Sequence, residues 1–200
     1  MSMRRNVVGG LAVIGALALA LGVGGGVYGL AMARRGFSAR DEPSALETKV
    51  ARAARSLSMP AGAREVNNPL VPVPSQALAD ARAHWGDHCA ICHAADGSGQ
   101  TPIGQGLYPR APDMRAAPTQ DLSDGELYWI IQNGIRLTGM PAWGQAHDEV
   151  GNNDSWALVG LIRTLPRLSP EEFDEIKAAM PQSQHEFNEK RMEDEFLDAQ

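Results

Sequence analysis

The chain contains very few cysteines. Only two of its 200 residues are cysteine, Cys89 and Cys92, and two residues separate them. A pair this close cannot clamp a fold, and no other disulfide is possible within the chain, so a disulfide-stabilised scaffold is excluded. The two thiols must therefore have a chemical or redox use.

The chain also lacks an excess of positive charge. Lysine and arginine number 18 against 24 aspartate and glutamate residues, for a formal net charge of −6. The acidic excess is concentrated in residues 169–200, where ten acidic residues stand against three basic ones. A nucleic-acid-binding protein needs a clustered basic surface on its folded domain. We therefore predict no nucleic-acid partner.

Charged residues are absent between Val7 and Ala33. This run of 27 residues is longer than the roughly 20 apolar residues that a helix needs to cross a bilayer. A cleaved export signal is the alternative, because residues 31–33 have the small-x-small form of a cleavage site. The apolar core of such a signal is usually about 7 to 15 residues long, so we expect residues 1–35 to be retained as a membrane anchor.

A sheet-forming pattern is absent as well. No alternation of apolar and polar residues is long enough for a sheet, whereas helical spacing is frequent in residues 76–168. Ser123 and Glu126 match a capping box, Gly134 is suited to end the helix that they begin, and Asp154 is suited to cap a last helix. We therefore predict a small all-α domain here. The apolar face of its first predicted helix consists of Leu78, Ala81, Trp85 and Cys89.

Residues 36–75 are rich in alanine, arginine and proline, and we expect them to be a linker between the anchor and the domain. Ser44 and Glu47 predict a short helix within it. Its basic residues are expected on a solvated face, with contact to anionic lipid as the alternative. The basic residues are Lys49, Arg52 and Arg55, and the apolar residues at helical spacing are Leu46, Val50, Ala54 and Leu57.

Residues 169–200 form an acidic tail with two helix-capping signals. Ser169 and Glu172 predict one helix, and Ser183 and Glu186 predict a second after Pro181. A tail with so few apolar residues has little to bury by itself, so it either packs on another surface or is solvated.

The pattern Cys-Ala-Ile-Cys-His over residues 89–93 is typical of covalent haem attachment. Two intervening residues in one helical turn match the separation of the two haem vinyl groups, and the imidazole of His93 is then placed below the iron. Zinc would need further ligands that a second cysteine pair would normally supply. Thioredoxin-like chemistry would need a strand before the motif, where a helix is predicted.

The iron then needs a sixth ligand from the opposite side. Met140 is the favoured candidate, because Gly139 permits a close approach and Pro141 keeps the chain out of a helix, so that the thioether can project from a loop. Met114 is an alternative that would more often be core filler. His147 is a second alternative, which would make a bis-histidine site.

These two motifs, in this order, give residues 76–168 a resemblance to class I cytochromes c, a family of small all-helical proteins. Trp85 and Ala81 match the aromatic and small positions that the family carries before the first cysteine. The resemblance implies one haem c bound through the two cysteines, with histidine and methionine as axial ligands.

The resemblance also suggests other residues of the haem pocket. A proline carbonyl commonly orients the axial histidine in this family, and Pro109 is the nearest match. Trp129 and Trp143 are weaker candidates for contact with the haem edge, since either could equally serve in core packing. No catalytic residue is expected.

The function implied is the transfer of single electrons between redox partners of a respiratory or photosynthetic chain. Histidine and methionine fill both axial positions, which favours electron transfer over catalysis. The acidic surface predicts a partner with a basic docking site. The protein could be a free carrier or a subunit of a larger membrane complex. A haem enzyme or gas sensor with a labile sixth ligand, and a non-haem membrane-anchored docking protein, are the alternatives.

The expected location also follows from the resemblance. In bacteria, haem of this kind is attached after export, so the haem domain is expected in the periplasm. The anchor would then lie in the inner membrane with its N-terminus in the cytoplasm. Arginines flank both ends of the apolar run, at Arg4 and Arg5 and at Arg34 and Arg35, so charge alone does not orient it.

Overall fold

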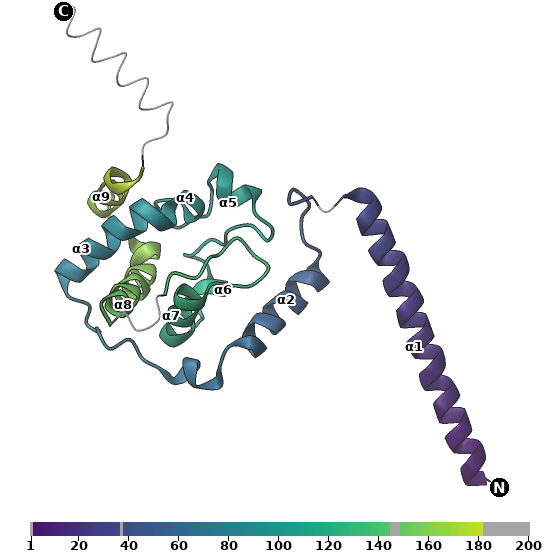
Figure 1. The fold of residues 1–200 in the computed structure, drawn as a ribbon. Helices are drawn as coiled ribbons and strands as arrows, with labels where there is room; N and C mark the ends of the chain where they lie inside the picture. The colour runs from purple at the N-terminus through teal and green to yellow at the C-terminus, as the bar shows by residue number, and fades with distance from the viewer. Residues whose placement is uncertain (1, 37, 145–148, 182–200) are drawn as a thin grey trace, which may run out of the picture. The chain divides into compact units, whose positions relative to one another are not determined.

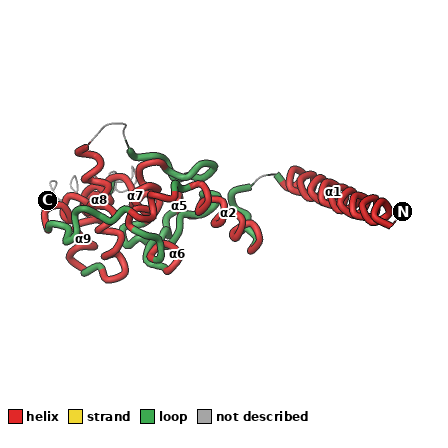
Figure 2. The backbone as a smooth tube through the Cα atoms, turned by 90° about the horizontal axis from the view of Figure 1, so that it is seen from below, coloured by secondary structure: helices red, strands yellow, loops and turns green. Residues whose placement is uncertain are grey.

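The computed structural model describes residues 2–36, 38–144 and 149–181. The chain divides into two compact units, Met1–Asp41 and Glu42–Gln200. Within the described ranges, every regular element is a helix or a helical turn (Figure 2). The predicted all-α class is therefore confirmed.

The first unit consists mainly of one long apolar helix, α1, over Ser2–Arg35. Its stretch Gly9–Arg35 has 27 residues and a mean hydropathy of 2.1, and none of it is buried against the rest of the protein. By length and composition, this helix can cross a membrane, although an export signal meets the same criterion. Helix α1 contains the whole of the predicted apolar run, Val7 to Ala33, and is a candidate anchor.

The core of the second unit lies between three helices, α3 (Ser75–His84), α7 (Asp124–Asn133) and α8 (Glu149–Thr164). Helix α8 packs against both α3 and α7 (Figure 1). Each large apolar side chain buried there contributes about 1.5–3 kcal/mol relative to exposure. Large buried side chains of this core include Trp85, Leu127, Ile131, Trp156, Leu161 and Ile162.

The ends of these helices agree only in part with the prediction. Ser123 and Glu126 form the expected capping box, and Gly134 follows the last residue of α7. Asp154, however, does not cap the last helix: α8 already begins at Glu149 and continues through this position. The Asp154 side chain is exposed, so a polar residue is tolerated on that face of the helix.

Residues 42–75 form part of the second compact unit. Helix α2 (Ala45–Ser58) begins after the Ser44 cap, and a 3₁₀ turn follows at Ala61–Glu65. A Cβ added to Gly125 would lie only 1.9 Å from the carbonyl oxygen of Ala63, so this turn packs directly on α7. The Asn68 amide donates a 2.9 Å hydrogen bond to the carbonyl of Trp156. The segment predicted as a spacer is therefore packed on the helical core.

The start of the acidic tail also packs on the core. Helix α9 (Pro170–Ala179) has the predicted capping box of Ser169 and Glu172, and it contacts α3 (Figure 1). The Ile176 side chain is fully buried, and Arg82 of α3 pairs with Glu172 at 3.2 Å. The second predicted tail helix, from Ser183, lies outside the described residues.

The packing of α9 predicts a measurable contribution to stability. Replacing Ile176 with alanine would leave a cavity in a fully buried site, and we expect a loss of about 2–5 kcal/mol. Ile103→Ala is the control, because Ile103 is 47% exposed and its truncation should cost about 0.5 kcal/mol or less. Urea unfolding measures both. An Ile176→Ala variant as stable as Ile103→Ala would contradict the packing of α9.

Candidate haem site

The motif over residues 89–93 lies where the first helix of the domain changes its winding. Helix α3 continues into a π-helical turn at Trp85–Cys89, followed by the short helix α4 at Ala90–His93. Helix α9 packs against this turn so closely that a Cβ on Gly86 would lie 2.4 Å from the carbonyl oxygen of Ile176. Cys89 and Cys92 form no disulfide with each other. Both thiols are therefore available for another reaction.

The chain turns sharply after His93. Ala94 has φ 64° and ψ 159°, a conformation that non-glycine residues rarely adopt. The indole N–H of Trp85 donates a 3.1 Å hydrogen bond to the Ala94 carbonyl, and the Trp85 ring centre lies 5.8 Å from that of His93. The N–H of Gly99 donates to the His93 carbonyl at 2.8 Å. These contacts hold the backbone on both sides of the imidazole.

A loop after α7 carries Met140 back towards this motif. The N–H of Ile135 donates to the Met140 carbonyl at 3.1 Å, and the N–H of Met140 donates to the hydroxyl of Thr138 at 3.1 Å. The N–H of Trp143 donates to the Ile131 carbonyl at 3.0 Å, which anchors the far end of the loop on α7. These hydrogen bonds fix the backbone of the loop at Met140 and at its far end.

Gly134 permits the loop to fold back on α7. Its φ is +63°, and an added Cβ would lie 2.6 Å from the carbonyl carbon of Pro141 and 2.7 Å from the carbonyl oxygen of Met140. We expect Gly134→Ala to displace the loop and to cost about 1–3 kcal/mol in stability. If Met140 binds iron, the long-wavelength thioether band of the oxidised protein should weaken as well.

Gly106→Ala is the matched control for this prediction, because a Cβ at Gly106 meets no atom within 4 Å. Thermal unfolding and the absorption spectrum should be compared between the two variants. Equal stability and equal spectra would show that the loop does not depend on the glycine.

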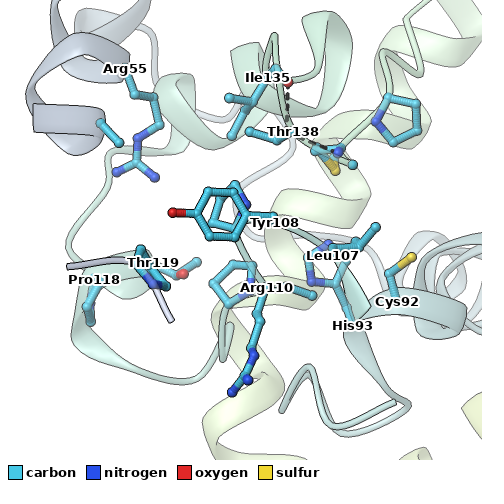
Figure 3. A pocket seen from close by; sticks show the side chains of 18 of the residues that line it. Arg55, Cys92, His93, Leu107, Tyr108, Arg110, Pro118, Thr119, Ile135 and Thr138 are labelled. Carbon is cyan, nitrogen blue, oxygen red and sulfur yellow. Dashed lines mark hydrogen bonds between the residues drawn. The ribbon is translucent and has the colours of Figure 1, made fainter. Parts of the chain in front are cut away.

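A cavity of about 490 Å³ lies between the motif and the loop (Figure 3). Its volume is within the range of about 300–1,000 Å³ that is usual for cofactor and ligand sites. Residues 107–112 form another wall of the cavity. They lie between two short helices, α5 (Pro102–Gly106) and α6 (Ala117–Gln120). All four residues predicted to hold haem line the cavity, namely Cys89, Cys92, His93 and Met140.

The titratable groups of the motif are in a poorly hydrated environment. Burial, with a smaller effect from Cys92, raises the pKa of the Cys89 thiol to about 12. Burial also raises the pKa of Cys92 and lowers the pKa of His93. The thiols are therefore protonated and the imidazole is neutral at pH 7, and a neutral imidazole has a nitrogen lone pair that can bind a metal.

Met140 is better placed than Met114 to face His93 across the large cavity. Met114 lines only a smaller void of about 30 Å³, which His93 and Met140 also line. Met114 also packs against the apolar core, as expected for core filler. His147 lies outside the described residues. Of the two methionines, only Met140 lines both spaces.

The weaker predicted pocket residues separate into two groups. Pro109 and Trp143 line the large cavity, whereas Trp129 lines neither cavity. The backbone carbonyl that faces the His93 imidazole belongs to Pro112, and it partly offsets the effect of burial on the His93 pKa. The Nδ1 atom of His93 is buried and has no hydrogen-bond partner within the described residues. Pro109 and Pro112 both follow the motif closely in the sequence, so the sequence pattern alone does not choose between them.

Helix α2 forms a further wall that sequence reasoning did not place at the site. Glu47, Arg52 and Arg55 line the cavity, and Glu47 accepts a hydrogen bond from the hydroxyl of Tyr108. The Arg55 side chain extends from α2 into the cavity (Figure 3). The arginines are thus not simply on a solvated face. The capping box revealed the helix, but no pattern in one sequence indicated what it packs against.

The residues around the cavity fit haem c. Two unpaired thiols and a neutral imidazole come from one turn of chain, and a thioether comes from the opposing loop. Sulfur and imidazole are suitable axial ligands for haem iron. The His93 imidazole lies beside the Pro112 carbonyl, and a backbone carbonyl commonly orients a metal-binding histidine.

Fold and site together define residues 76–162 as a haem c electron-transfer domain of the cytochrome c class. Residues 76–162 match the model of the family described as cytochrome C oxidase, cbb3-type, subunit III. The match covers less than half of the chain and does not include α1, α2 or α9. No match was found among curated proteins.

Proposed function

We propose that the protein is a membrane-tethered c-type cytochrome with one covalently bound haem, which transfers single electrons between redox partners. The observation that carries this proposal is the arrangement of Cys89, Cys92, His93 and Met140 around one cavity of suitable size. The residues come from two segments that are about fifty positions apart, and the fold brings them to the same space.

The protein would contribute attachment, axial ligation and shielding from water. Haem c, when bound, supplies an iron centre that accepts and donates one electron. Cys89 and Cys92 would hold it by thioether bonds, while His93 and Met140 would occupy the two axial positions. With both positions filled, no site remains for oxygen or peroxide, and this favours electron transfer over haem catalysis.

The proposed location rests on α1 and on the cofactor. Helix α1 is long and apolar enough to serve as the tether. Attachment of haem outside the bacterial cytoplasm would place residues 42–200 in the periplasm and the N-terminus in the cytoplasm. The family description supports a role in a respiratory oxidase complex. The net charge of −6 favours partners with basic docking surfaces, because complementary charge speeds encounter.

The test is to isolate membranes from cells that produce the full chain and to extract the protein with mild detergent. We expect it to resist extraction by alkaline carbonate, to be cleaved in spheroplasts by added protease, and to titrate as a single one-electron centre. Co-purifying proteins then distinguish an oxidase subunit from a free carrier. A protein without haem, or one found in the cytoplasm, would refute the proposal.

A further inference from the structure

Arg55 of α2 differs from the other half-buried arginines of the second unit. Arg82 and Arg163 each form an ion pair with a carboxylate, Arg82 with Glu172 at 3.2 Å and Arg163 with Asp124 at 2.8 Å. Arg55 has no ion-pair partner among the residues that the structure describes, and its Nε atom is buried without a hydrogen-bond partner there. A buried guanidinium nitrogen without a partner is costly unless an anion binds it.

The carboxylates near Arg55 interact with other groups. Glu47, on the same helix, accepts a hydrogen bond from Tyr108. Glu126 of α7 is paired with Arg64 at 3.0 Å. Glu126 attracts Arg55 electrostatically, but burial and the neighbouring Arg52 have the larger effects and lower the pKa of Arg55. An arginine remains charged in proteins even so. The positive charge of Arg55 therefore lies beside the cavity, and no carboxylate of the described residues forms an ion pair with it.

Arg52 and Arg55 are three residues apart on α2, so they lie on adjacent turns of one face. Both line the large cavity. Figure 3 shows the Arg55 guanidinium directed into the cavity, on the side to which the Tyr108 hydroxyl also points. A ligand that extends a carboxylate to this end of the cavity would meet two guanidinium groups, which suit carboxylate recognition.

We propose that α2, which lies outside the stretch matched to the cytochrome family, completes the haem pocket, and that Arg55, assisted by Arg52, binds the carboxylate of a haem propionate. The inference rests on the proposed haem. It assigns to residues 45–58 a role in binding the cofactor and in setting its potential.

The test compares Arg55→Leu with Lys49→Leu in the full-length, haem-loaded protein. Both variants remove one positive charge from α2, but Lys49 is exposed and does not line the cavity. A nearby positive charge favours the reduced centre, which is the less positive of the two states. We expect Arg55→Leu to lower the midpoint potential by about 59 mV, which corresponds to a tenfold change in the one-electron equilibrium. Lys49→Leu should leave the potential close to that of the unmodified protein.

The dependence of potential on pH provides a second readout. Without Arg55, the pKa of the propionate should be higher than in the unmodified protein. The propionate should also bind a proton more tightly when the haem is reduced than when it is oxidised. The potential of Arg55→Leu should therefore rise as the pH falls from 7 towards 5, in contrast to a flatter profile in the unmodified protein. Arg55→Lys, which keeps the charge, should restore most of the behaviour. Other charged or titratable groups also line this cavity or act on Arg55. They are Glu47, Arg52, His88, Cys89, Cys92, His93, Tyr108, Arg110 and Glu126.

The outcomes separate this inference from the proposed function. Covalent haem with the same potential and pH profile in Arg55→Leu and Lys49→Leu would overturn the role of Arg55 and leave the cytochrome proposal intact. Absence of haem from the unmodified protein would overturn both. If Arg55→Leu does not load haem, Arg55→Gln is measured instead, because it removes the charge with a smaller change in polarity and length.

Discussion

Replacing Met140 with alanine is expected to open one axial position of the iron. The long-wavelength band of the oxidised protein should disappear, and the midpoint potential should fall by on the order of 0.2 V, part of the roughly 0.8 V range that axial ligands control. The physical reason is that a thioether favours the reduced iron, and its loss leaves a site for water or added ligands. Absorption spectroscopy and a redox titration measure both effects.

Met114→Ala is the matched control for this experiment. Met114 lines only the small void beside His93 and is partly buried against the core, so its loss should reduce stability by about 0.5–3 kcal/mol without removing the long-wavelength band. Loss of the band in Met114→Ala, with an unaltered spectrum in Met140→Ala, would reverse the assignment. A band absent from the unmodified protein would favour a haem enzyme or sensor with a labile sixth ligand.

Replacing both Cys89 and Cys92 with alanine is expected to abolish covalent haem. The variant should show no haem stain in a denaturing gel and should have the mass of the polypeptide alone. Without the cofactor, the walls of a cavity of about 490 Å³ would lose their packing partner, so the cooperative thermal transition should weaken or vanish. Intact mass spectrometry and calorimetry measure the two effects.

The single variants provide the graded control. Cys89→Ala and Cys92→Ala each retain one thiol on the cavity wall, and each should retain a fraction of the stain through one thioether bond. Persistence of covalent haem in the double variant would refute attachment through these residues. Free thiols on every chain of the unmodified protein, detected by alkylation, would refute it as well.

The helices of the domain could be predicted from the sequence where their end signals are local. The capping box of Ser123 and Glu126 and the stop at Gly134 bound α7, and the cap at Ser169 begins α9, as the spacing indicates. These signals act within one turn of backbone, so one sequence contains them in full. The start of α8 is different, because the cap-like residue Asp154 lies within the helix.

The packing of α2 illustrates what one sequence does not contain. Its apolar residues recur at helical spacing, yet Leu46 is 72% exposed and Leu57 is 86% exposed. The cavity is lined from the other face, by Glu47, Arg52 and Arg55. Periodicity locates a helix, but the face that is buried depends on distant segments and on the groups that a bound ligand presents.

The pocket residues also differ in whether a local sequence motif or the packing of distant segments places them at the cavity. The turn of residues 89–93 and the loop at Met140 could be predicted from local motifs, and both line the cavity. Pro112, whose carbonyl faces His93, could not be separated from Pro109 by spacing alone. The choice depends on how the chain folds around α5 between the motif and these prolines.

The packing of residues 42–75 on the core sets the reach of the protein. Only residues 36–41 connect α1 to the second compact unit, and six residues fully extended span about 20 Å. With α1 embedded in a bilayer, the domain could not diffuse away from the lipid surface. Its search for a partner would be a lateral one, and a partner would have to present its docking site within about that height plus the width of the domain.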